Sequence, residues 1–110
     1  MAGQKVLSPK ILDQVKTYAH ILTGAGIPYE KMIIFGSQAK GTAKPWSDID
    51  LCVVSKSFND ENEDYLVKLM NLRGADTLDI EPHPFTPGDL AEKWDPLAHE
   101  IRKTGIVVKL

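Results

Sequence analysis

Residues 36–54 read GSQAKGTAKPWSDIDLCVV, and this stretch decides the fold because it joins two strands through a glycine turn and a loop. Directly before it, residues 32–35 (MIIF) form a short apolar run that is typical of a buried strand. Residues 49–55 are rich in branched apolar side chains and predict a second strand. Gly36-Ser37 ends the first strand, and a short helical turn is expected over residues 38–40.

The flanking sequence predicts further helices and strands. Ser8 as N-cap and Pro9 at the first helical position begin a helix that ends at Gly24. A second helix is expected from Asn59 or Asp60 to Gly74. A third strand is expected over residues 77–83, stopped by Pro82 and Pro84. A third helix is expected to begin at residues 87–89 and to end at Gly105, with Pro96 kinking or splitting it. Residues 106–110 are expected to form an edge strand. This alternation predicts an α/β fold, a small mixed β-sheet with helices packed on it.

Length and composition favour one soluble domain. The 110 residues are 43% apolar and 25% charged, which fits a single domain over residues 1–110. The single cysteine, Cys52, excludes an intramolecular disulfide and is compatible with a reducing compartment. No apolar run approaches the ~20 residues of a membrane span, and the N-terminal MAGQKVLSPK lacks the apolar stretch of a signal peptide. We therefore expect a cytoplasmic protein with no membrane partner.

Charge is unevenly distributed along the chain. The net charge of −2 argues against a protein that binds nucleic acid through a basic surface. Residues 59–64 carry four acids and no base, whereas residues 36–46 carry two lysines and no acid. A basic loop in an acidic protein favours a small anionic ligand over a polyanion, although both stretches could also be solvated surface.

The glycine turn has the features of a phosphate site. Gly36 permits close approach of the backbone to a ligand, and the following helical turn offers unpaired N–H groups. The Ser37 hydroxyl adds a donor, and Lys40 and Lys44 could neutralise phosphate charge. Taken alone, this pattern is common in α/β proteins.

Two carboxylate pairs follow on strands. Asp48 and Asp50 lie two residues apart, so both side chains are expected on one face, about 6.6 Å apart along the chain. Such a pair can bind Mg²⁺ together with substrate phosphates. The alternative for an isolated D-x-D is that Asp48 caps a turn and Asp50 pairs with a lysine. Asp79 and Glu81 follow the same spacing on the third expected strand, between the apolar residues Leu78 and Ile80.

Together these residues resemble a known superfamily. Gly36-Ser37, ten residues and then Asp48-Ile49-Asp50 match the signature of the DNA polymerase beta-type nucleotidyltransferases. The whole stretch is most similar to the minimal nucleotidyltransferases, including the antitoxin partners of HEPN toxins. The IEPHPF stretch at residues 80–85 and the length extend the likeness over most of the chain. The resemblance implies a polymerase beta-like core and transfer of a nucleoside monophosphate, AMP from ATP in the simplest case, to a hydroxyl acceptor.

The resemblance also implies roles for individual residues. Gly36 and Ser37 match the phosphate-binding pair, and Lys40 stands where the family commonly has a basic residue. Asp48 and Asp50 match carboxylates that bind two Mg²⁺ ions. Glu81 is the first choice for the third carboxylate, as a metal ligand or as the base for the acceptor hydroxyl, and Asp79 is the second choice.

Several other residues carry two interpretations. Cys52 is expected to be a small core residue rather than a nucleophile. His83 could touch a metal or the triphosphate, but no second histidine has ligand spacing, so a structural role is favoured. Trp46 could cover the nucleotide or pack in the protein. Tyr65 and Trp94 are expected on helical stripes, as core or partner surface.

Two functions of different classes follow from this sequence. The first is the Mg²⁺-dependent nucleotidyltransferase, with Asp48, Asp50 and Glu81 as catalytic residues. The second is a non-catalytic, antitoxin-like module that pairs with a helical HEPN-type partner. Larger family members carry a C-terminal helical domain, so a partner or a second copy is expected to complete the site. The acceptor could be a protein hydroxyl, RNA or a small molecule.

Overall fold

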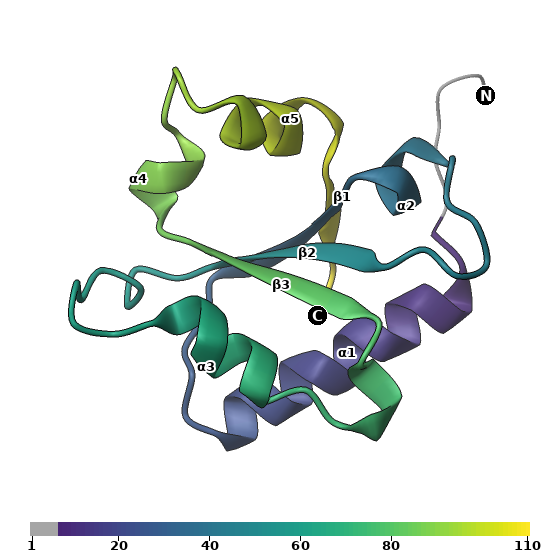
Figure 1. Ribbon diagram of the computed structural model, residues 1–110, viewed down its shortest axis with the longest axis horizontal. Helices are drawn as coiled ribbons and strands as arrows, with labels where there is room; N and C mark the ends of the chain where they lie inside the picture. The colour runs from purple at the N-terminus through teal and green to yellow at the C-terminus, as the bar shows by residue number, and fades with distance from the viewer. Residues whose placement is uncertain (1–6) are drawn as a thin grey trace.

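The computed structural model describes residues 7–110, and residues 1–6, which hold part of the stretch examined for a signal peptide, lie outside it. Within the described residues, four strands form one mixed sheet in the order β3-β2-β1-β4 (Figure 1). β1 pairs antiparallel with β2 and β4, and β2 pairs parallel with β3. The elements are α1 (Pro9–Gly24), β1 (Lys31–Phe35), α2 (Ser37–Lys40), β2 (Ile49–Val54), α3 (Tyr65–Asn71), a 3₁₀ helix η1 (Ala75–Thr77), β3 (Ile80–Phe85), α4 (Pro87–Leu90), α5 (Pro96–Thr104) and β4 (Ile106–Val108).

Helices cover both faces of the sheet. α1 and α3 lie on one face, and α4 and α5 lie on the other (Figure 1). Side chains of β2 alternate accordingly: Leu51 and Val53 join the apolar cluster with α1, whereas Cys52 and Val54 join the cluster with α5. The expected α/β architecture is therefore confirmed.

The first helix forms as its caps predict. The Ile11 amide donates a hydrogen bond of 3.3 Å to the Ser8 hydroxyl, and Pro9 occupies the first turn. The buried Tyr18 hydroxyl donates to the Leu69 carbonyl at 2.7 Å, which ties α1 to α3. No helix formed by residues 7–110 combines the length and the apolar character that crossing a bilayer requires.

The expected third strand was wrong in both its limits. The structure has η1 where the strand was expected to begin, and β3 runs from Ile80 to Phe85 through Pro82 and Pro84. β3 lies at the edge of the sheet and the proline positions face away from β2, so their missing N–H groups break no hydrogen bond of the sheet. Leu78 lies before the strand and is 60% exposed rather than part of the core.

The expected second helix was wrong at its start. The Asp60 carboxylate accepts a hydrogen bond of 2.9 Å from the Asn62 amide, which forms a turn instead of a helix. Asp64 is the residue that caps α3, because its carboxylate accepts from the Val67 amide at 3.1 Å. Residues 60–64 are therefore a loop before the helix, not its first turn.

The third expected helix is split, as Pro96 predicted. Thr86 caps α4 and Asp95 caps α5, and the two are separate helices. Trp94 lies in the loop between them and is 83% exposed, so it does not pack in the core. Tyr65, in contrast, is half-buried and packs on Phe58 with ring centroids 4.9 Å apart.

Cys52 is a core residue, as expected. Its side chain is fully buried in the middle of β2. Burial raises the pKa of its thiol to about 12, and the charge of Lys31 opposes this only in part. The thiolate is therefore scarce at neutral pH, which excludes Cys52 as a nucleophile.

The Tyr18 hydroxyl is expected to contribute measurably to stability. Tyr18→Phe should lower the free energy of unfolding by about 1–2 kcal/mol, because the Leu69 carbonyl then keeps only a longer bond from the Leu72 amide at 3.3 Å. Urea denaturation measures the change. Tyr29→Phe is the matched control, because no described residue hydrogen-bonds the Tyr29 hydroxyl. Equal stability of the two variants would contradict a structural role for the buried bond.

Cys52 also makes stability depend on alkaline pH. Because the folded thiol has a raised pKa of about 12, the unfolded chain loses this proton first, from its ordinary value of 9.0 upward. Stability should therefore be complete below about pH 9 and decline towards pH 12. Cys52→Ala should flatten this decline in urea titrations at successive pH values. An unchanged slope in the variant would show that other groups cause the decline.

Candidate functional site

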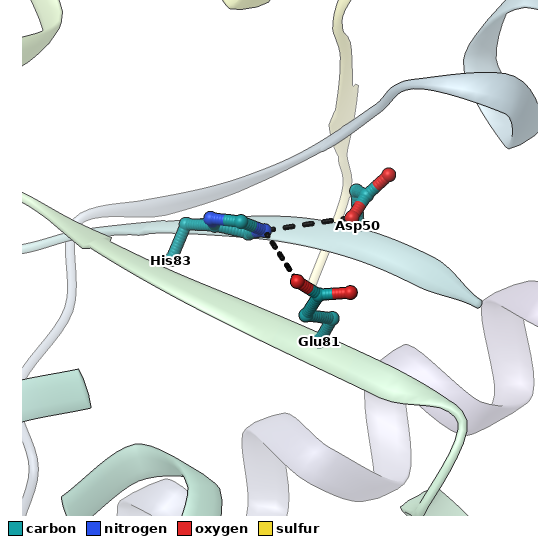
Figure 2. A group of neighbouring side chains, drawn as sticks. All are labelled: Asp50, Glu81 and His83. Carbon is teal, nitrogen blue, oxygen red and sulfur yellow. Dashed lines mark ion pairs between the residues drawn. The ribbon is translucent and has the colours of Figure 1, made fainter. Parts of the chain in front are cut away.

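Three side chains from the two neighbouring parallel strands point toward one another. Asp50 of β2 lies opposite Glu81 of β3, and His83 follows two residues later on β3 (Figure 2). By strand alternation all three lie on the sheet face that α4 and α5 partly cover. We call Asp50, Glu81 and His83 the strand cluster.

The distances within the strand cluster are short. His83 Nε2 lies 3.4 Å from Asp50 Oδ1 and 3.9 Å from Glu81 Oε1. One donor atom of each residue lies within 4.8 Å of the others. The side chains of His83 and Asp50 are 23% and 30% exposed, whereas that of Glu81 is 52% exposed, so the cluster is open to solvent on its Glu81 side.

The His83 ring is held by packing. It meets the Phe35 ring edge-on, with centroids 5.0 Å apart and an interplanar angle of 65°. Its Nε2 atom is shielded from solvent, and no described residue forms a hydrogen bond with it. The contact with Asp50 is therefore a close approach of a ring nitrogen to a carboxylate oxygen rather than a formed hydrogen bond.

Gly36 lies directly against Asp50. Its backbone angles, φ 72° and ψ −148°, belong to a region that only glycine adopts readily. A Cβ atom there would overlap Asp50 Oδ2 and lie 3.3 Å from Asp50 Cγ. The turn between β1 and α2 thus meets the strand cluster, and Ser37, the first residue of α2, is half-buried beside it.

The two lysines of the basic loop lie outside the strand cluster. The Lys40 ammonium lies 3.6 Å from the Glu100 carboxylate of α5. Lys44 is exposed in a turn in which its amide donates to the Ser47 hydroxyl at 2.8 Å. Neither ammonium forms an ion pair with the cluster carboxylates among residues 7–110, and their role in nucleotide binding stays a prediction.

Asp48 and Asp79 lie beside the strand cluster. Both are exposed, and they share a surface hollow of about 340 Å³ with Glu81 and His83. The Asp79 carbonyl accepts a hydrogen bond of 2.8 Å from the Ile49 amide, immediately before β3 begins. The structure therefore groups Glu81, and not Asp79, with Asp50. Trp46, 79% exposed, does not pack in the core.

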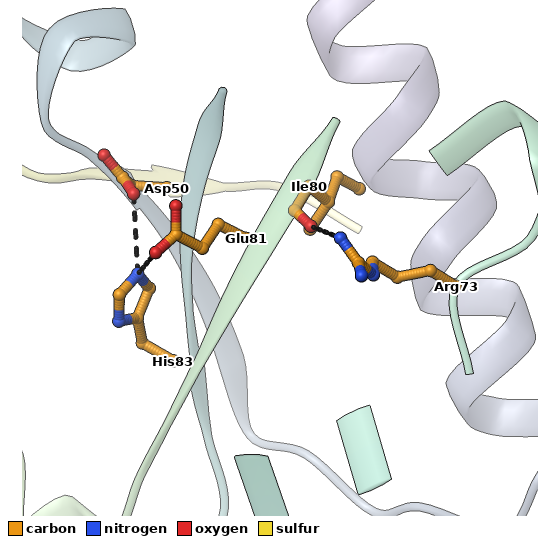
Figure 3. Close-up of polar contacts among 5 residues, drawn as sticks. All are labelled: Asp50, Arg73, Ile80, Glu81 and His83. Atoms are coloured by element: carbon orange, nitrogen blue, oxygen red, sulfur yellow. Dashed lines mark hydrogen bonds and ion pairs between the residues drawn. The ribbon is translucent and has the colours of Figure 1, made fainter. Parts of the chain in front are cut away.

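Arg73 supports the start of β3 from the other side of the strand. Its Nη1 donates to the Ile80 carbonyl at 3.2 Å (Figure 3). The same atom donates to the Leu78 carbonyl at 3.1 Å, and Nε donates to the Met70 carbonyl at 3.0 Å. These bonds tie the end of α3 to the residue that precedes Glu81. The guanidinium is therefore committed to backbone carbonyls and does not neutralise the cluster.

The strand cluster fits a divalent cation. Among the described residues, the Asp50 and Glu81 carboxylates accept no hydrogen bond, whereas Asp64, Asp89 and Asp95 each accept one from a backbone amide. Two convergent carboxylates without donors repel each other unless a cation lies between them. Carboxylate oxygens suit Mg²⁺, and an imidazole nitrogen can join the set for transition metals.

His83 is the member of the strand cluster that the sequence favoured least. It lies two residues from Glu81, the same spacing that paired Asp48 with Asp50. A structural role was favoured because no second histidine has ligand spacing. The other members of the cluster are carboxylates, and Asp50 comes from the neighbouring strand, a proximity that spacing along the sequence does not show.

The glycine turn gives a matched pair of substitutions. Gly36→Ala should destabilise the protein by more than about 2 kcal/mol, because it adds a clash with Asp50 to an unfavourable backbone conformation. Gly41→Ala, also at positive φ but with open space around it, should cost about 1–2 kcal/mol. Urea denaturation compares the two. Similar losses would mean that Asp50 moves away freely and that the close approach is unimportant.

Comparison with known proteins agrees with this geometry. The nucleotidyltransferase domain family model matches residues 25–83, and no curated protein matches the sequence significantly. A crystal structure of a presumed nucleotidyltransferase from Sulfolobus solfataricus shares the fold, with a TM-score of 0.60, 20% identity, and coverage of 97% of this chain and 90% of that one. So does a chain of a toxin-antitoxin crystal structure with AMP-PNP, with a TM-score of 0.60, 21% identity, and coverage of 89% and 72%. Because the family match spans more than half of the chain, the protein belongs to the nucleotidyltransferase domain family and is a nucleotidyltransferase.

Proposed function

We propose that residues 1–110 act as one domain that transfers AMP from ATP to a hydroxyl group of a protein partner, in the cytoplasm and with Mg²⁺. The observation that carries the proposal is the contact between two halves of one motif. Gly36, at the start of α2, lies against Asp50, and Asp50 lies opposite Glu81. A phosphate-binding turn and metal-binding carboxylates are needed at this separation, because a triphosphate must touch both.

The carboxylates have distinct positions in this proposal. Asp48 and Asp50 would bind the cations. Glu81, whose side chain is the most exposed of the strand cluster, would help bind the second ion or accept the proton of the acceptor hydroxyl. Two Mg²⁺ ions bound there would activate the hydroxyl and neutralise the leaving pyrophosphate. Asp48 is exposed and lines the hollow that also contains Glu81 and His83, so it could reach a cation bound there.

The turn and the lysines bind the triphosphate. The Ser37 hydroxyl forms no hydrogen bond with another described residue, so it is free to donate to a phosphate oxygen. Lys40 would exchange Glu100 for phosphate, and this exchange costs little because a partly exposed ion pair contributes about 0–1 kcal/mol. Lys44 and Trp46 are exposed on the same loop, where they can close on the nucleotide.

A binding module is the second candidate. It is favoured by the crystal structure of a toxin-antitoxin with AMP-PNP, a nucleotide analogue, because a chain of that structure shares the fold. In this case the chain would pair with a helical HEPN-type protein and the nucleotide site would serve little or no chemistry. The strand cluster favours the enzyme, because a module that only binds its partner has no need for two convergent carboxylates that accept no hydrogen bond from the described residues.

Transfer of labelled nucleotide tests the proposed function. The wild type, incubated with α-labelled ATP, Mg²⁺ and a co-purified helical partner, should label the partner, and mass spectrometry should identify added AMP. Asp50→Asn should lower labelling by more than about 100-fold, because loss of a metal ligand exceeds the loss typical of supporting residues. Asp13→Asn, an exposed acid on α1, is the matched control and should label normally.

The carboxylates should act as a unit. The Asp48→Asn, Asp50→Asn double variant should be only slightly worse than either single variant. It should remain folded by circular dichroism, because removing like charges relieves repulsion. Equal labelling by the wild type and the double variant would contradict the enzyme, and the binding module would then take its place.

A further inference from the structure

We infer that His83 is a direct metal ligand and that the strand cluster takes a first-row transition-metal dication, with Mn²⁺ as its test ion, in preference to Mg²⁺. The inference rests on the proposed function, because it concerns one cation of the same site. It adds that the two cation positions differ. The set of Asp50, Glu81 and His83 includes a nitrogen, and the second position, towards Asp48 in the same hollow, would keep Mg²⁺.

The distances within the strand cluster suit a single cation bound by all three side chains. An ion with ligand bonds of about 2.1 Å places neighbouring donor atoms about 3 Å apart and opposite ones about 4.2 Å apart. The two distances from His83 Nε2, 3.4 Å to Asp50 and 3.9 Å to Glu81, lie in this range. All three donor atoms lie within 4.8 Å of one another.

The His83 nitrogen has no other partner. Nε2 is shielded from solvent, and residues 7–110 supply it with no hydrogen bond. A buried nitrogen without a hydrogen-bond partner lowers stability, so we expect a ligand to bind this atom. The Phe35 ring holds the imidazole edge-on, and the regular alternation of β3 directs it toward the two carboxylates (Figure 2). A cation between them would bond this nitrogen and neutralise both acids.

Nitrogen in the ligand set changes metal preference. Mg²⁺ favours oxygen donors and keeps most of its water, whereas transition-metal dications accept imidazole readily. A site made of carboxylates alone would bind Mg²⁺ and Mn²⁺ with similar affinities. Adding His83 favours Mn²⁺, so the side chain sets the selectivity of this position.

Electron spin resonance of bound Mn²⁺ detects the nitrogen directly. Spin-echo spectra of the wild-type chain with Mn²⁺ alone should show the coupling of a directly bound imidazole nitrogen. His83→Gln should abolish this coupling and weaken Mn²⁺ binding by at least about tenfold. His20→Gln, an exposed histidine on α1, is the matched control and should keep both properties. Mg²⁺ should displace Mn²⁺ from the variant at a much smaller excess than from the wild type.

Isotope labelling keeps the test independent of the variant's folding. Wild-type protein made with nitrogen-15 histidine should show the corresponding change in coupling, with no substitution at all. Bound Mn²⁺ without nitrogen coupling, or with coupling unchanged in His83→Gln, would overturn the inference. Asp50→Asn separates the two proposals: if it abolishes Mn²⁺ binding while the wild type lacks nitrogen coupling, the proposed function stands and the His83 inference fails. If the wild type binds no Mn²⁺, the His83 inference fails, and Mg²⁺-dependent labelling decides the proposed function separately.

Discussion

The parallel pairing of β2 with β3 is the constraint on which the site depends. It places Asp50 opposite Glu81 and Ile49 opposite Ile80. Ile49, Leu51 and Ile80 are at most 1% exposed on the face toward α1, and they fix which side chains point to the other face. A slip of one residue would turn Asp50 into the apolar core and Leu51 into the site, so the hydrophobic pattern and the carboxylates specify the same register.

Features at both ends of this pairing protect it. Arg73 holds the carbonyls before Glu81, and Pro82 and Pro84 leave the outer edge of β3 with few free donors. An edge with prolines is a poor template for another strand, so the open side of the site is kept from edge-to-edge association. On the inner side, Gly36 permits the close approach of α2 to Asp50. The site is thus built mostly from backbone geometry, with few side-chain hydrogen bonds.

Much of the fold could be predicted from local sequence patterns, because the two central strands and the first helix are each specified by residues within or next to them. The apolar runs at residues 32–35 and 49–54, the break at Gly36 and the Ser8 cap each specify their element without long-range information. The limits of β3 could not be predicted in this way. Whether Pro82 ends a strand depends on its place in the sheet, which only the tertiary structure decides. The start of α3 was ambiguous because Asp60 and Asp64 can both cap a helix, and the Asn62 turn selects the second.

The candidate site also combines residues that local sequence patterns identify with one that only the tertiary structure brings to it. The spacing of Gly36, Asp50 and Glu81 could be recognised in the sequence. The grouping of His83 with the two carboxylates depends on the pairing of β2 with β3, which only the tertiary structure shows. If the acids bind the triphosphate through a cation, ATP binding depends on that cation, and calorimetry of ATP binding to the wild-type chain measures this dependence. We expect binding with Mg²⁺ and a loss of affinity of at least about tenfold in excess chelator, because the carboxylates then repel the phosphates. Equal affinity with and without the cation would contradict it.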